Sequence, residues 1–199
     1  QATVNDLTAR ILSLQSIEQE NKELRQLLFF SKESGHDALV ADVIHKSNLE
    51  VEKTVVINKG TAHGIDAGYA VITGEGTLIG RVQRAAPYSA LVLLTIDSTS
   101  NILSTLSNTE NTIAGVASGS QGTSLALTLI PKNIAIRPEQ KVLTNGLQEH
   151  IPAGLYVGEI ISLEESENEI FNAAILKPPY TTENITLVAV LLPRGTRTQ

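Results

Sequence analysis

The sequence predicts a mainly β protein, in which an N-terminal amphipathic helix is followed by two small antiparallel β-barrels. Residues 1–36 carry apolar side chains at helical spacing, whereas the later chain consists of short β-rich runs separated by Gly, Pro, Asn and Ser. Two parts of the β-rich region also resemble each other. Short strands between turn residues are typical of antiparallel sandwiches and barrels.

The first 36 residues are predicted to form a dimeric coiled coil. Their apolar residues recur three and four positions apart, and from Leu14 onward they follow a heptad with Asn21 at an a position. A single Asn at such a position favours a parallel pair, and Glu20 and Arg25 have the g–e spacing of an interhelical ion pair. The predicted seam consists of Leu7, Ile11, Leu14, Ile17, Asn21, Leu24 and Leu28. The alternative is a lone helix that packs on its own β region.

The β-rich region contains twelve runs that are predicted to be strands. Each run is short, rich in Val, Ile, Leu and Thr, and bounded by turn residues. They span residues 38–44, 53–58, 70–73, 77–82, 90–96, 102–106, 112–117, 124–130, 141–144, 155–163, 171–177 and 186–192. The final residues, 194–199, contain no such run and are predicted to be disordered.

The β-rich region is interpreted as two related units. Residues 78–82 and 156–160 share a hydrophobic-Gly-x-hydrophobic pattern, and each pattern follows a similar pair of runs. Two copies are too few for a solenoid, which needs at least three repeats. Chance similarity between β-rich sequences is the alternative.

Composition argues against nucleic acid as a partner. The formal net charge is −6, the 15 Lys and Arg are scattered, and only 4 Tyr and 3 Phe are available for stacking. The absence of Cys excludes disulfides and thiolate metal sites, and no apolar run is long enough to span a membrane. Because the chain begins at Gln1 and contains no Met, we expect that a segment upstream, including a membrane anchor, has been removed.

No set of residues predicts a metal site, a cofactor or catalysis. The four histidines are His36, His45, His63 and His150, and none has a second ligand at metal-binding spacing. A double barrel raises the question of a Ser-His-Asp triad, for which His45, Asp97 and Ser118 are the available types. Ser118, however, lacks the glycine-framed turn of a nucleophile. We therefore predict a protein that is not an enzyme, with an unusual hydrolase as the alternative.

Two further motifs are better explained as hairpin turns. The glycines at 74, 76 and 80 imitate a dinucleotide fingerprint, but the residues after them are predicted to be a strand and not a helix. The carboxylates between 164 and 169 lie in a polar stretch, which is typical of a solvated hairpin tip and not of a general acid–base pair.

The motifs, taken in order, resemble those of the MreC family of rod shape-determining proteins. The similarity begins with the Asn-containing helix and continues through residues 54–68, 80–97, 129–132 and 142–158. The chain departs from the family pattern at Asn145-Gly146, at Gln148-Glu149-His150 and at Tyr156, all in predicted loops or near them.

The resemblance implies a non-catalytic scaffold of the bacterial cell-elongation machinery. Such a protein lies on the extracytoplasmic face of the inner membrane, dimerises or forms filaments, and contacts MreD, penicillin-binding transpeptidases and the MreB system. It also implies an inserted arrangement, with residues 38–48 and 122–193 in one barrel and 51–121 in the other; sequential barrels, 38–120 and 121–193, are the alternative. A periplasmic adaptor of an export system is the competing function, although adaptors usually have a second, returning helix.

Overall fold

The fold is mainly β, as predicted. A computed structural model describes residues 14–15, 21–22, 24, 36–48, 52–74, 76–107, 115–120, 123–132, 135–164 and 170–193. The described residues before position 36 have helical backbone, but most of the predicted helix lies outside the described residues and stays a prediction. Within the described ranges, no helix is long and apolar enough to cross a membrane.

Twelve strands and two short 3₁₀ helices make up the described structure. The strands are β1 (Asp37–Asn48), β2 (Lys53–Ile57), β3 (Ala70–Thr73), β4 (Thr77–Ala85), β5 (Ala90–Leu94), β6 (Ile102–Leu106), β7 (Gly115–Ser120), β8 (Ser124–Pro131), β9 (Lys141–Thr144), β10 (Tyr156–Glu164), β11 (Phe171–Lys177) and β12 (Leu187–Leu192). The 3₁₀ helices are η1 (Thr61–His63) and η2 (Thr182–Asn184). Each strand overlaps one of the predicted runs.

Six strands close into an antiparallel barrel, which we call the first ring. Its pairings run β1–β2–β5–β4–β3–β12 and return from β12 to β1. Inward-facing side chains alternate along the strands, as in Val55 and Ile57 on β2 and Val92 and Leu94 on β5, which are fully buried. The apolar interior therefore follows from the period-2 alternation of each run.

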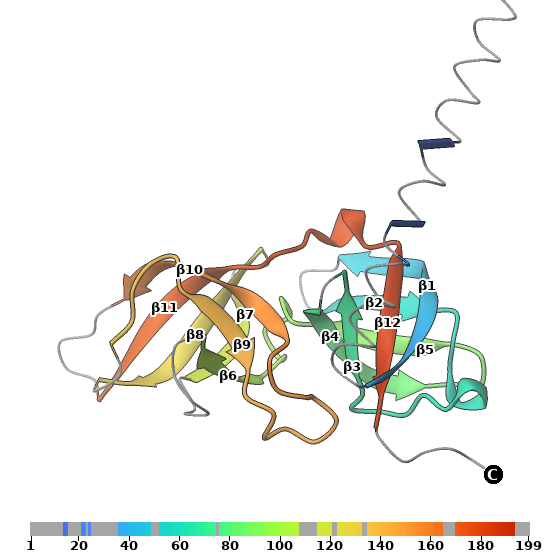
Figure 1. The fold of residues 1–199 in the computed structure, drawn as a ribbon, viewed down its shortest axis with the longest axis horizontal. Helices are drawn as coiled ribbons and strands as arrows, with labels where there is room; N and C mark the ends of the chain where they lie inside the picture. The colour runs from blue at the N-terminus through green and yellow to red at the C-terminus, as the bar shows by residue number, and fades with distance from the viewer. Residues whose placement is uncertain are drawn as a thin grey trace, which may run out of the picture.

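The other strands, β6 to β11, form a second ring. Their antiparallel pairings run β6–β7–β8–β11–β10–β9 and return from β9 to β6. Leu125 and Leu127 on β8 and Leu176 on β11 are fully buried inside it. The two rings lie side by side, and the chain crosses between them twice (Figure 1).

The strand pairings do not follow either predicted division of the chain. Residues 102–177 form the second ring and are inserted between β5 and β12, so 38–48 pairs with 53–57 and 187–192 and not with residues of the second ring. The reason lies in β1, which has a bulge at Ile44: its first half pairs with β12 and its second half with β2.

Candidate binding cleft between the two rings

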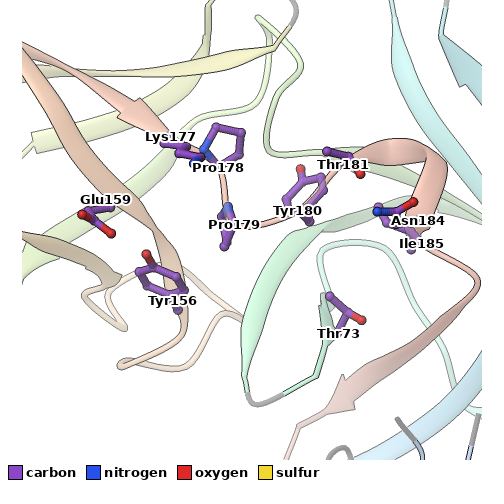
Figure 2. Close-up of a pocket in the computed structure, with 10 residues that line it drawn as sticks. All are labelled: Thr73, Tyr156, Glu159, Lys177, Pro178, Pro179, Tyr180, Thr181, Asn184 and Ile185. Atoms are coloured by element: carbon purple, nitrogen blue, oxygen red, sulfur yellow. The ribbon is translucent and has the colours of Figure 1, made fainter. Parts of the chain in front are cut away.

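A cleft of about 540 Å³ opens where the two rings meet. Its walls come from the end of β3, from the outer face of β10, and from the segment that returns from β11 to β12 (Figure 2). The lining residues are Thr73, Tyr156, Glu159, Lys177, Pro178, Pro179, Tyr180, Thr181, Asn184 and Ile185. This volume is within the range of about 300–1,000 Å³ that is usual for ligand-binding pockets.

A bulge in β10 turns two polar side chains toward the cleft. Tyr156 is opposite Leu143 on β9, whereas Glu159 is opposite Lys141, so one extra residue lies between the two pairs. The bulge places Val157 on the buried side and leaves Tyr156 and Glu159 on the same outer face. Burial raises the pKa of the Tyr156 phenol, and the nearby Glu159 carboxylate raises it further.

The glycine of the repeated pattern allows the neighbouring strand to approach β10. A Cβ added at Gly158 would lie 2.7 Å from the carbonyl oxygen of Lys177, and one added at Gly80 on β4 would lie 2.2 Å from that of Leu93. The two glycines therefore have the same steric role in the two rings. The strands that contain them also join the rings, through a parallel bridge between Tyr156 and Thr77.

Tyr180 ties the returning segment to the first ring. Its hydroxyl donates to the carbonyl oxygen of Ile79 at 3.0 Å and lies 2.7 Å from the hydroxyl oxygen of Thr95. Because the phenol has one proton, which points to Ile79, the Thr95 hydroxyl donates to the phenolic oxygen. Burial raises the pKa of Tyr180 to about 12.

Asp97 fixes the other crossing, which leads from β5 to β6. Its carboxylate accepts hydrogen bonds from the backbone N–H of Lys53 at 2.8 Å and from the backbone N–H and hydroxyl of Thr99. Its carbonyl oxygen accepts from the N–H of Gly119 on β7. Burial alone would raise the pKa of Asp97, but the hydrogen bonds from Thr99 and Lys53, with the Lys53 charge, lower it. One residue thus contacts both rings.

Charged side chains form a row beside the cleft. Glu159 is opposite Lys141 on one side and Lys177 on the other, so the three side chains share the outer face of the second ring. Within the described part of the chain, Glu159 forms no ion pair with either lysine. The Lys141 ammonium lies 6.0 Å from the centre of the Tyr156 ring. The row carries two positive charges and one negative charge.

A second cleft has a volume of about 470 Å³. It is lined by residues 146–152, by 191–193 and by His36. His150 packs edge-on against Tyr69 with 5.0 Å between ring centres, and its Nε2 lies 3.5 Å from Glu149. His150 therefore has a structural role: it packs the loop after β9 against the start of β3.

The predicted dimer seam is described at only three positions. The Leu14 side chain is 65% exposed and Asn21 is exposed, whereas Leu24 is partly buried against the apolar core. The remaining seam residues and the predicted Glu20–Arg25 pair lie outside the described residues. The packing of Leu24 on the core is what the lone-helix alternative predicts. The exposure of Leu14 in a single chain is what the dimer seam predicts, because a seam residue is covered only by the partner helix.

The candidate triad is not assembled. The carboxylate oxygens of Asp97 are bonded to Lys53 and Thr99, and no hydrogen bond joins His45 on β1 to Asp97 or to Ser118 on β7. Among the described residues, no group of three His, Asp or Glu could hold a metal ion. The glycines at 74 and 76 have positive φ and connect the antiparallel strands β3 and β4, as the hairpin interpretation predicted.

The residues that form the first cleft are absent from the sequence-based candidates. Their local signal is Pro178-Pro179-Tyr180, a rigid stretch between the last two strands. Consecutive prolines favour an extended connection, and a tyrosine after them is suited to anchor it. The sequence contains the rigid stretch, but the partners of Tyr180 are about 85 and 101 residues away in the chain.

Comparison with known proteins identifies the family. The model for the barrel core of the rod shape-determining protein MreC matches residues 43–192. The cell shape-determining protein MreC of Listeria monocytogenes is 31% identical over 179 residues, which are 88% of this chain and 60% of that protein. The chain thus spans about 60% of the length of this relative.

Solved structures show the same fold. A structure of MreC superimposes with a TM-score of 0.78 at 22% identity, covering 89% of this chain and 99% of the other. A complex between Penicillin-Binding Protein (PBP2) and MreC from Helicobacter pylori contains a chain with a TM-score of 0.62 at 17% identity, covering 78% and 98%. Since the family model matches most of the chain, this protein belongs to the MreC family of rod shape-determining proteins.

Proposed function

We propose that this chain is a non-catalytic scaffold of the bacterial cell-elongation machinery that docks penicillin-binding transpeptidases. The observation that carries the proposal is the family match over residues 43–192, together with a relative of the same fold that was solved in complex with PBP2. MreD and the MreB system stay predictions as further partners.

A direct binding measurement tests the docking role. The chain would be immobilised and exposed to the extracytoplasmic part of the PBP2-type transpeptidase from the same organism. We expect the enzyme to bind the immobilised chain saturably. We expect it not to bind an immobilised control protein of similar charge and size. Absence of binding by the folded chain would exclude this enzyme class as a direct partner.

We further propose that the scaffold stands on the extracytoplasmic side of the inner membrane, carries two small barrels, and dimerises through residues 1–36. Leu14 is the best probe of the dimer, because its side chain is 65% exposed in the single chain. Leu14→Glu is expected to weaken self-association at least tenfold and to leave the unfolding midpoint of the β region unchanged. Sedimentation equilibrium measures the dimerisation constant. If Leu14→Glu dimerises as strongly as the wild type, the dimer interface lies in the rings and not in residues 1–36.

A further inference from the structure

The cleft between the rings presents polar groups that no neighbouring residue uses. The hydroxyl groups of Tyr156 and Thr181, the carboxamide of Asn184, the Glu159 carboxylate and the Lys177 ammonium all line it. Within the described residues, none of these side-chain groups makes a hydrogen bond or an ion pair. They include both donors and acceptors, from both ends of the cleft.

The contacts that connect the two rings, which we call the joint, form the cleft in the absence of a ligand. Tyr180 fixes one crossing to Thr95 and Ile79, Asp97 fixes the other, and the backbone N–H of Tyr156 donates to the carbonyl of Gly76 at 2.9 Å. A ligand therefore does not have to order the two rings, which lowers the entropic cost of binding.

The lining chemistry favours an extended polypeptide over a sugar. Sugars pack flat on exposed aromatic faces, but the Tyr180 phenol is anchored in the joint and the Lys141 ammonium lies by the Tyr156 ring. Pro178 and Pro179 supply apolar walls instead. An extended backbone alternates N–H and C=O groups, which match the mixed donors and acceptors of the cleft.

Charge defines one side chain of the occupant. Glu159 and Lys177 line the cleft and Lys141 lies beside it, so this row has an excess of one positive charge, in a protein whose net charge is −6. Neither lysine is neutralised by Glu159 through an ion pair in the described structure. A carboxylate on the ligand would therefore gain a charge-assisted contact with Lys177.

We propose that this cleft binds an extended segment of the docked transpeptidase that carries an Asp or Glu side chain opposite Lys177. The inference rests on the proposed function and adds where and how the enzyme is bound. It assigns Lys177 to the carboxylate, and Thr181 and Asn184 to the backbone of the segment. The apolar walls of Pro178 and Pro179 contact the neighbouring side chains.

Paired charge reversals provide the test. Lys177→Glu and Arg84→Glu change the net charge equally, and both side chains are exposed. Arg84 lies about 23 Å along β4 from Thr77, at roughly 3.3 Å per residue, and so is remote from the cleft. We expect Lys177→Glu to weaken enzyme binding about tenfold or more and Arg84→Glu to change it less than about twofold. Unfolding midpoints equal to wild type show that both variants are folded.

Two further measurements separate the possible outcomes. Thr181→Val is expected to weaken binding about threefold, because it removes a hydroxyl at nearly constant volume. A photo-crosslinking amino acid in place of Thr181 is expected to label an extended enzyme segment with an Asp or Glu within a few residues. If the wild-type chain does not bind the enzyme, the proposed function fails. If it binds and Lys177→Glu behaves like Arg84→Glu, or a soluble glycan oligomer occupies the cleft instead, this inference fails while the scaffold role stands.

Discussion

Replacement of Tyr180 by Phe removes the hydroxyl that ties the returning crossing to the first ring. The phenol donates to the Ile79 carbonyl at 3.0 Å and accepts from Thr95, whose side chain is fully buried. Ile79 keeps its second bond, from the N–H of Thr95 at 2.8 Å. The main loss is therefore a buried Thr95 hydroxyl without an acceptor, which costs about 1–3 kcal/mol.

Urea unfolding followed by circular dichroism measures this loss. Tyr88→Phe is the matched control, because Tyr88 is 75% exposed and its ring lies edge-on to the His63 ring. We expect the control to lie within about 0.5 kcal/mol of the wild type. Equal stabilities for the two variants would show that the Tyr180 hydroxyl does not stabilise the joint. A third comparison, Thr95→Val with Tyr180→Phe, should cost less than the sum of the single changes, because the two hydroxyls bond each other.

Three more predictions concern the joint and the rings. Because the pKa of Tyr180 is raised to about 12, the unfolded chain loses the phenolic proton at a lower pH than the folded chain. The contribution of Tyr180 to stability should therefore be complete below about pH 10 and decrease between about pH 10 and about pH 12. The urea midpoints of the wild type and Tyr180→Phe should converge over this range. The lowered pKa of Asp97 has the opposite sign: its contribution is present at neutral pH and is lost in acid as pH falls through the folded-state pKa, and Asp97→Asn should flatten that acid limb of the stability curve. Gly80→Ala would place its Cβ 2.2 Å from the Leu93 carbonyl and should cost about 2–3 kcal/mol, against about 1 kcal/mol for Gly64→Ala, which meets no atom but has a φ of +82°. Chemical unfolding distinguishes the two glycine variants.

Local sequence predicted the strands well, because a strand is defined by a short-range pattern. Buried and partly exposed positions alternate over the first five residues of β8, so its run of apolar residues was recognisable without its partners. The prediction stopped too early in β1, because the run 38–44 ends before the polar residues Lys46, Ser47 and Asn48. In the structure they continue the strand past the bulge at Ile44 and pair with β2. Backbone pairing with β2 therefore extends the strand through residues whose polar side chains do not predict one.

The division into rings and the site needed contacts between distant residues. Both predicted divisions failed for the same reason: a run such as 187–192 carries no signal that says whether it pairs with β1 and β3 or with β11. The cleft could not be predicted for the same reason, because its walls come from distant parts of the chain. Thr73 on β3 and Tyr156 on β10 are about 80 residues apart in the sequence.

The sequence by itself determined the twelve strands, the hairpin turn between β3 and β4 and the family, because all three depend on the order and spacing of residues along the chain. The tertiary structure decided that residues 102–177 are inserted between β5 and β12, and that Tyr180 and Asp97 join the two rings. These features arise from hydrogen bonds between segments far apart in the chain. Any of several apolar runs can satisfy the same local pattern, and only the closure of each ring selects the partner.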